Sequence, residues 1–348
     1  MQRVILLIAG LVALSACERT PNAPPFELVK DWKLPAPIAS IDITHDGQSV
    51  LLGATTGESS LWSAPWNLSV PFDPVAEPLL AARFTEDGHS VFLRARGSVE
   101  LRADNGALLL DPHIRVKRPA QFAMSSPSGR YVAFDTSVYD VEAMRIMVQT
   151  DPNEDQRGLA FAGNRMVLVT RVHDPQLTIL RLDGRETRER HVPDDVRAGA
   201  ISSDGRYTAA GTDRDVLVYD GELSDPACER RTKAPVEELQ FSGSARWLAV
   251  LSGKRLLVLN ATSCEPLATL LLLDTGAALD IDADLIAVAD ASANVYVYDL
   301  FNARLVGRAK PFAGKVSHLR LNAASRSLLV TANGETSAEV KLLRITGR

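Results

Sequence analysis

A short polar turn between two apolar runs returns along this chain at a nearly constant interval. It reads Thr-His-Asp-Gly at residues 44–47, Thr-Glu-Asp-Gly at 85–88, Ser-Pro-Ser-Gly at 126–129, Ser-Asp-Gly at 203–205 and, more weakly, Ser-Gly-Ser-Ala at 242–245. The Asp-Gly pair supplies the positive φ angles that a tight hairpin requires. Self-similarity of this kind indicates a repeat architecture, in which each unit buries its apolar face against its neighbours.

Each repeat has the same order of elements. An apolar strand leads through the tight turn to a second apolar strand. A small loop and a third strand that ends in a polar residue follow, and a variable connection leads to the next repeat. Short apolar runs bounded by Gly, Asp, Asn, Ser and Pro are typical of strands, and almost no segment keeps a helical period. Second strands are expected at residues 49–52, 91–93, 131–134, 166–169, 207–210, 247–250, 285–288 and 328–330.

These runs predict an all-β chain that folds as a single β-propeller of eight four-stranded blades. The turns recur at intervals of about 35 to 41 residues, which is the length of a propeller blade. The last unit supplies only three strands, whereas residues 26–34 form a strand that precedes the first full unit. We expect this N-terminal strand to complete the last blade, because closure leaves only short, protected edges. Seven blades are the alternative if the fourth unit is irregular.

The third strands carry a resemblance to a known family. Val-Leu-Val-Tyr-Asp at 216–220 and Val-Tyr-Val-Tyr-Asp at 295–299 resemble the third strand of the WD repeat, with Tyr-Asp where that family has Trp-Asp. Looser copies stand at 61–63 and 256–260. The resemblance covers residues 26 to 346 in pattern and implies a WD-like propeller.

The N-terminus resembles the export signal of a bacterial lipoprotein. A basic start is followed by an apolar segment of the length that a secretory signal uses, and Leu-Ser-Ala-Cys at 14–17 is similar to the lipobox. The resemblance implies a signal peptide at residues 1–16, acylation (palmitate) of Cys17, a Pro-rich tether at 17–25 and the propeller domain at 26–348. Glu18 stands where an inner-membrane retention signal usually has Asp, which favours the periplasmic face of the outer membrane.

Composition limits the classes of partner. The formal net charge is −5, and no basic stripe of the kind that follows a phosphate backbone is present, so no nucleic-acid partner is expected. No internal apolar run approaches the length of about 18 residues needed to span a bilayer. The run at 267–273 is read as a buried strand. We therefore expect a monomeric body that meets the membrane only through its lipid.

Two cysteines remain after Cys17. Cys228 and Cys264 lie about one blade apart, in corresponding connections of the fifth and sixth units. An exported protein resides in a compartment that permits disulfides, so a bridge between these blades is expected. The alternative is two unpaired thiols, because outer strands of adjacent blades can lie too far apart.

Known catalytic motifs are missing from the sequence. It has no zinc-protease helix motif, nucleophile elbow, phosphate-binding glycine loop or Cys-x-x-Cys. The six histidines show no metal-ligand spacing, and the Asp-Gly turns lack the acids of a calcium loop. No cofactor or bound metal is expected.

The loops between second and third strands form one face of a propeller, where partners usually bind. Here they carry interleaved basic and acidic residues, a pattern that suits electrostatic selection of a protein partner. The residues expected on this partner-binding rim are Arg94, Arg96, Arg118, Arg171, His173, Asp174, Arg214, Asp215, Lys254 and Arg255.

Together these features predict a non-catalytic scaffold of the bacterial envelope that binds another envelope protein. One alternative is a propeller enzyme, such as a lactonase or hydrolase, with a metal ion in the central channel. It would need acids or histidines that converge on the axis, and Asp42, Asp280 and Asp282 are the only acids expected inside first strands. Another alternative is an immunity or inhibitor protein.

Overall fold

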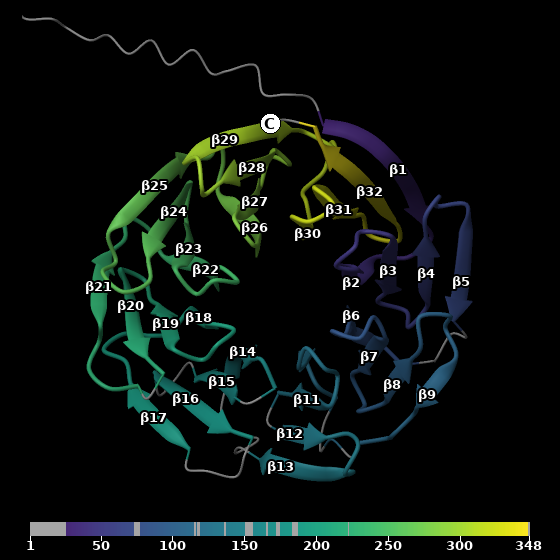
Figure 1. Ribbon diagram of the computed structural model, residues 1–348, viewed down its shortest axis with the longest axis horizontal. Coiled ribbons are helices and arrows are strands. Elements are labelled where there is room, and N and C mark those ends of the chain that lie inside the picture. Colours follow the sequence, from purple (N-terminus) through teal and green to yellow (C-terminus); the bar gives the residue numbers. More distant parts are fainter. Residues whose placement is uncertain are drawn as a thin grey trace, which may run out of the picture.

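The computed structural model describes residues 26–72, 77–114, 116, 119–135, 137–149, 156–164, 166–171, 175–182, 187–221 and 223–346. These residues form 32 strands in eight four-stranded antiparallel sheets and contain no helix. The sheets are arranged as blades around a central channel (Figure 1). The fold is therefore the eight-bladed β-propeller that the repeats predicted, and not the seven-bladed alternative. None of the described segments forms an apolar helix long enough to cross a membrane.

The first four blades follow the chain in order. Blade 1 consists of β2 (Ile38–Ile43), β3 (Ser49–Ala54), β4 (Ser59–Ser63) and β5 (Leu68–Phe72). Blade 2 consists of β6 (Leu79–Phe84), β7 (Ser90–Arg94), β8 (Val99–Arg102) and β9 (Leu108–Leu110). Blade 3 consists of β10 (Ala123–Ser125), β11 (Tyr131–Phe134), β12 (Ser137–Asp140) and β13 (Arg145–Gln149). Blade 4 consists of β14 (Gln156–Ala162), β15 (Met166–Arg171), β16 (Gln176–Arg181) and β17 (Arg188–His191).

The remaining blades continue the pattern until the last one. Blade 5 consists of β18 (Ala198–Ile201), β19 (Tyr207–Gly211), β20 (Asp215–Asp220) and β21 (Cys228–Arg231). Blade 6 consists of β22 (Val236–Phe241), β23 (Trp247–Ser252), β24 (Arg255–Asn260) and β25 (Pro266–Leu271). Blade 7 consists of β26 (Gly276–Asp282), β27 (Leu285–Asp290), β28 (Val295–Asp299) and β29 (Arg304–Ala309). Blade 8 contains β30 (His318–Asn322), β31 (Ser327–Asn333) and β32 (Ala338–Ile345).

The N-terminal strand β1 (Phe26–Leu34) completes blade 8, as expected. It pairs antiparallel with β32, from Phe26 opposite Ile345 to Leu34 opposite Ala338. In Figure 1 the two strands lie side by side at the outer edge of the ring. The two ends of the chain are thus joined in one sheet, which protects the edge that β32 would otherwise expose.

The hydrophobic core lies between neighbouring blades. Second and third strands such as β7 and β27 are buried on both faces, because each blade packs on two others; all six residues of β27 are buried. One such core joins blades 5 and 6 through Val216, Val218, Leu248 and Val250. Continuous Val, Ile, Leu and Ala runs therefore mark these middle strands.

The recurring turns have the geometry that their sequence predicted. Gly47 and Gly205 have φ angles of 69° and 72°, and their N–H groups donate to Thr44 O and Ser202 O at 2.8 Å. A side chain at Gly47 would also collide with Ser325 of blade 8, since a Cβ there would lie 2.2 Å from the Ser325 hydroxyl oxygen. These glycines are therefore required by backbone conformation and, at Gly47, by close approach.

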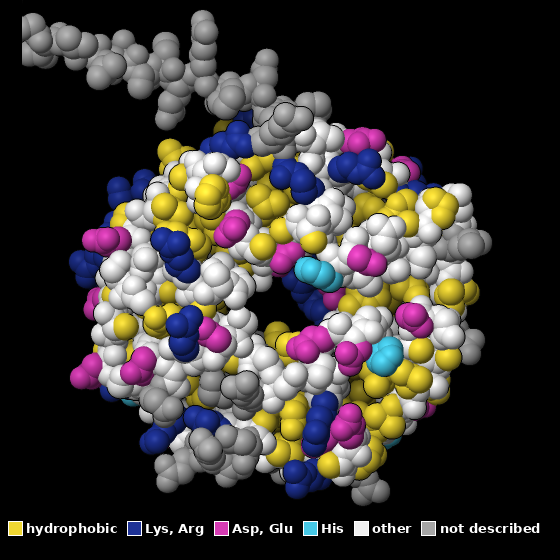
Figure 2. Space-filling view, viewed as in Figure 1, with side chains coloured by type: hydrophobic (Ala, Val, Ile, Leu, Met, Phe, Trp, Pro, Cys, Tyr) yellow, Lys and Arg dark blue, Asp and Glu magenta, His cyan; other side chains and the backbone are white. Residues whose placement is uncertain are grey.

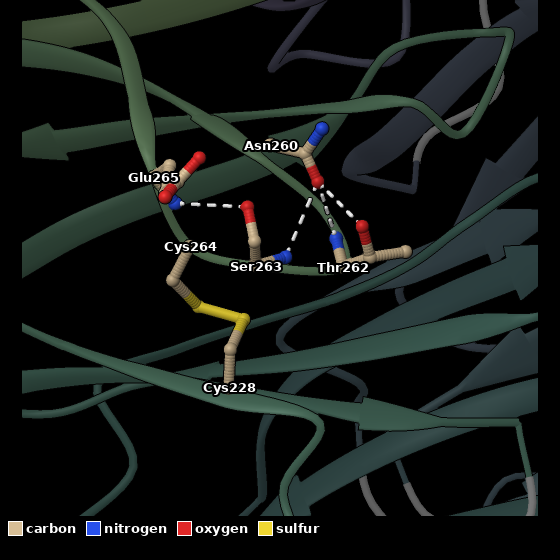
Figure 3. Close-up of a disulfide and its surroundings, with 6 residues drawn as sticks. All are labelled: Cys228, Asn260, Thr262, Ser263, Cys264 and Glu265. Carbon is tan, nitrogen blue, oxygen red and sulfur yellow. Dashed lines mark hydrogen bonds between the residues drawn. A yellow bond between two sulfur atoms is a disulfide. The ribbon is translucent and has the colours of Figure 1, made fainter.

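The structure contains the expected bridge between Cys228 and Cys264, with a Cα–Cα separation of 5.7 Å. Cys228 begins β21 of blade 5, and Cys264 lies in the β24–β25 turn of blade 6 (Figure 3). Asn260 organises that turn, because its side-chain oxygen accepts hydrogen bonds from the N–H groups of Thr262 and Ser263 at 2.9 and 3.2 Å. The bridge links the outer parts of two blades.

Polar side chains reinforce the junction of blades 8 and 1. The Asn333 amide donates to Ile38 O and accepts from Ile38 N, both at 2.9 Å, so it pairs with β2 as a neighbouring strand would. The Asn322 amide donates to Thr44 O and His45 O at 2.7 and 2.9 Å. The chain-closing junction therefore combines strand pairing with side-chain hydrogen bonds between residues far apart in sequence.

We predict that Trp32→Ala lowers the free energy of unfolding by about 3–5 kcal/mol, the usual range for a buried aromatic residue. Trp32 is 6% exposed and packs edge-on against Trp62 and Trp66, with ring centroids 5.7 and 6.2 Å away. Urea unfolding followed by circular dichroism measures the change. The exposed neighbour Lys33 supplies the control, since Lys33→Ala should stay within about 0.5 kcal/mol. Equal stability of the two variants would show that β1 does not close the ring.

Candidate functional site

One residue assigned to the rim from sequence is not on the surface. Arg94, at the end of β7, is 0% exposed, and its Nη1 lies 2.7 Å from Glu100 Oε1. Burial lowers the pKa of Arg94, while the nearby Glu100 and Glu77 carboxylates oppose that change. The prediction that Arg94 binds a partner is therefore corrected: its side chain belongs to the interior of blade 2. The loop pattern could not reveal this, because it does not show which way a strand-end residue points.

Other rim residues lie where a partner could reach them. Arg96, Arg214 and Lys254 are exposed, whereas Asp215 and Arg255 are partly buried. The side chain of Asp215 faces Arg231, with 3.6 Å between Oδ1 and Nε. Arg118, His173 and Asp174 lie outside the described residues, and so does the side chain of Arg171. Residues 1–25, which contain the predicted signal peptide, Cys17 and the tether, also lie outside them.

The structure joins the rim loops of blades 5 and 6 into one surface. Thr232 N–H donates to Arg214 O at 2.6 Å, which places the β21–β22 connection against the β19–β20 loop. Ser252 Oγ donates to Ala234 O at 2.6 Å, and Leu272 N–H donates to Lys254 O at 2.9 Å. Hydrogen bonds thus link these loops in sequence from Arg214 to the connection that follows β25.

Two exposed leucines lie in this surface. Leu271 and Leu273 are 66% and 61% exposed, and Lys254 Nζ donates to Leu273 O at 3.3 Å. The apolar run at 267–273 was expected to be buried, and that expectation is wrong for these positions because β25 is the outermost strand of its blade. We call the exposed set the blade 5–6 rim; it consists of Arg214, Arg231, Lys233, Lys254, Leu271 and Leu273.

A second polar region lines the central channel, which is visible as an opening with basic side chains on its wall (Figure 2). The innermost strands carry a polar residue two positions before the turn in five consecutive blades, from blade 6 through blades 7, 8 and 1 to blade 2. The series is Gln240, Asp280, Arg320, Asp42 and Arg83. The charges alternate from blade 7 to blade 2, which allows each to attract the next.

Asp280 is the most connected member of the series. One of its oxygens accepts from Leu321 N–H at 2.7 Å, and the other lies 3.2 Å from both Arg320 Nη1 and Gln240 Nε2. Burial raises the pKa of Asp280, and Arg320 and the Leu321 N–H oppose that change. Arg320 also approaches Asp42, with 3.9 Å between Nε and Oδ1, so one guanidinium bridges two carboxylates from different blades.

Glu238 is another acid of the channel and lies two residues before Gln240 on β22. Burial and the nearby Asp280 charge raise its pKa to about 7, against the attraction of Arg320 and a hydrogen bond from Leu279 N–H. The expectation that Asp42, Asp280 and Asp282 are the only acids in first strands is therefore wrong, because β22 also carries Glu237 and Glu238. Alternation alone does not tell which of these two adjacent residues faces inward. His318 also lines the channel, and burial lowers its pKa while its Nε2 lies 3.0 Å from Ile38 O.

The metal-dependent enzyme considered from sequence needs convergent ligands. Among the described residues, no three His, Cys, Asp or Glu side chains are grouped closely enough to hold a metal ion. Asp42 and Asp280 do approach one axis, but the guanidinium of Arg320 lies between them, where a shared cation would otherwise bind. No observation in the described part of the chain favours that alternative.

Comparisons with known proteins give the fold. No family model and no curated protein match the chain. Among solved structures, the computationally designed Ika8 protein matches with a TM-score of 0.76 and 16% identity, over 92% of this chain and 100% of that one. The C-terminal WD40 domain of Sif2 matches with a TM-score of 0.75 and 13% identity, over 92% and 99%. The chain therefore has the fold of a WD40-type β-propeller.

We predict that Glu238 contributes a component of stability that is lost as pH rises from about 4.5 to about 7, because Glu238 holds its proton more tightly in the folded than in the unfolded state. Glu238→Gln should remove this component and stabilise the protein by about 1–2 kcal/mol near pH 8, with little effect near pH 5. Urea unfolding at the two pH values measures it. A variant with the same pH dependence as the wild type would contradict the assignment.

Proposed function

We propose that this protein is a non-catalytic scaffold, anchored to a bacterial envelope membrane by a lipid on Cys17, that binds another envelope protein through the blade 5–6 rim. The observation that carries the proposal is the pair of exposed leucines, Leu271 and Leu273, beside exposed cations on one continuous surface. The WD40-type propeller fold supports a binding role.

The blade 5–6 rim combines two kinds of contact that protein interfaces use. The leucines offer apolar surface that becomes favourable when a partner removes it from water. Arg214, Arg231, Lys233 and Lys254 are exposed on the same rim, where Arg231 and Lys254 also face Asp215 and Asp274 at 3.6 and 3.5 Å. These cations would favour an acidic partner, since complementary charge sets specificity and association rate. The hydrogen bonds among the loops hold the surface in place before binding, which lowers the entropic cost of association.

The start of β1 is consistent with a lipid anchor on the other side of the molecule. Phe26 pairs with Ile345, whose N–H donates to the carbonyl of Arg326 in the β30–β31 turn. Leu34, at the other end of β1, leads to Pro37, whose carbonyl accepts from Thr55 N–H in a rim loop. An anchor at Cys17 would therefore join the face that bears the turns and leave the rim open to a partner in the periplasm, for which the outer membrane is the proposed location.

Binding through the rim can be tested by affinity purification from membranes of the native host. We expect the wild-type chain to recover one protein reproducibly and the Leu271→Asp/Leu273→Asp variant to recover at least about tenfold less of it, because buried charges without partners strongly oppose association. Met144→Asp is a matched control, since Met144 is 62% exposed but lies in blade 3, away from this rim. The proposal fails if no protein is recovered, or if the double variant retains it.

The lipid anchor has a separate test. Mass spectrometry of the mature N-terminal peptide should show a diacylated and N-acylated Cys17, and Cys17→Ala should remove both the modification and the processing at residue 16. Partition between membrane and soluble fractions gives a second readout. An unmodified mature N-terminus in the wild-type protein would contradict the anchor while leaving the rim proposal open.

A further inference from the structure

Among the described residues of the channel, one arginine makes no direct ion pair. Arg83, on β6, donates from Nη1 to Ile41 O at 2.6 Å and contacts Ser40 Oγ at 3.4 Å. Both contacts are to neutral acceptors on β2, and Ser40 uses its own hydroxyl hydrogen to bind Ala82 O. Within the described residues, no carboxylate oxygen lies within 4.0 Å of Arg83. The guanidinium is thus held in a defined position without a carboxylate in direct contact, although Asp42 and Asp280 attract it from a greater distance.

The carboxylates nearest to Arg83 already accept hydrogen bonds or face another arginine. Asp42 Oδ2 accepts from Phe84 N–H at 2.8 Å, and Oδ1 faces Arg320. Asp280 is engaged by Arg320, Leu321 and Gln240, as described above. Burial and repulsion from Arg320 lower the pKa of Arg83 to about 10, and the more distant carboxylates of Asp42 and Asp280 only partly oppose that change. An anion beside Arg83 would supply a negative group in direct contact with it.

The space in front of Arg83 has room for such an anion. A cavity of about 290 Å³ opens in the channel and is lined by Arg83, Ser317, His318 and Glu238, among others. Ser317 Oγ accepts from Asn333 N–H, so its hydroxyl hydrogen can be donated to a further acceptor. This volume lies at the lower end of the range for small-molecule sites, and polar donors from blades 2 and 8 line it.

We propose that the channel binds a small oxyanion, a carboxylate or phosphate group, through the guanidinium of Arg83. The planar fork of arginine donates two parallel hydrogen bonds to two oxygens of either group. Glu238 lies in blade 6, four blades from Arg83 around the ring, and borders the same cavity. This site is distinct from the blade 5–6 rim and does not depend on the scaffold proposal.

The charge on Glu238 should modulate the affinity for the anion. Asp280 on β26 and Arg320 on β30 are the charged groups that face Glu238, and β18 on its other side carries no titratable side chain between Ala198 and Ile201. As the pH rises through about 7, Glu238 becomes negative and repels an anion in the cavity. Burial lowers the pKa of His318, which favours its neutral form and limits any opposite effect of this residue. Binding should weaken with rising pH.

Titration calorimetry of the full-length chain with inorganic phosphate, and separately with acetate, tests the site. We expect saturable binding at one site, weakened at least about tenfold by Arg83→Met, because a charge-assisted hydrogen bond is lost. Arg246→Met is the matched control: Arg246 is exposed outside the channel, and its replacement should change nothing. Binding of phosphate alone would identify a phosphate-bearing ligand, binding of acetate alone a carboxylate, and binding of both a site that recognises charge. Absence of saturable binding by either ion overturns the proposal.

Two further measurements keep the test decisive if Arg83→Met does not fold. The Nε–Hε signal of Arg83 in an NMR spectrum, identified by its absence from Arg83→Lys, should shift when either ion saturates the wild-type protein. No shift would contradict the assignment to Arg83. Acetate keeps one charge between about pH 6 and about pH 8, so its affinity should fall across that range in the wild type and stay nearly constant in Glu238→Gln. An equal fall in both proteins would exclude the role of Glu238.

Discussion

The pairing of β1 with β32 is the contact on which the rest of the structure depends. Every other blade is formed by consecutive strands, whereas blade 8 takes its outermost strand from the other end of the chain. Each interblade core needs a blade on both sides, so an open ring would expose apolar surface at two blades at once. The amides of Asn322 and Asn333 add hydrogen bonds from blade 8 to blade 1 at this junction.

Charged side chains in the channel also link neighbouring blades, close to the axis of the ring. Asp42 reaches from blade 1 to a backbone N–H of blade 2, and Asp280 reaches from blade 7 to one of blade 8, while Arg320 joins both acids. Such contacts satisfy the inner edges of the first strands, which have no strand partner on the channel side. Arg83 differs from the others because it bonds only neutral acceptors, and this difference is the basis for proposing an anion site there.

Much of the fold could be predicted from the sequence because its signals are local. Asp-Gly turns, short apolar runs and a regular period do not depend on distant residues, and they predicted eight blades, the closing strand and the bridge between Cys228 and Cys264. The residues of the candidate site were harder to predict from the sequence. Arg94 points inward at a strand end, and Leu271 and Leu273 are exposed although their run is continuously apolar. In each case the direction of a side chain relative to neighbouring blades decides the outcome.

The sequence by itself determined the repeat, the number of strands in each unit and which residues stand two positions before each turn. Only the tertiary structure decided what those residues meet, because ring closure brings together groups from opposite ends of the chain, such as Asp42 and Arg320. The packing of the blades leaves Arg83 without a carboxylate in direct contact, and strand pairing within blade 6 places Lys254 beside the exposed Leu273. Electrostatic and apolar contacts act over a few ångströms, so their partners are set by the packing of blades and not by spacing along the chain.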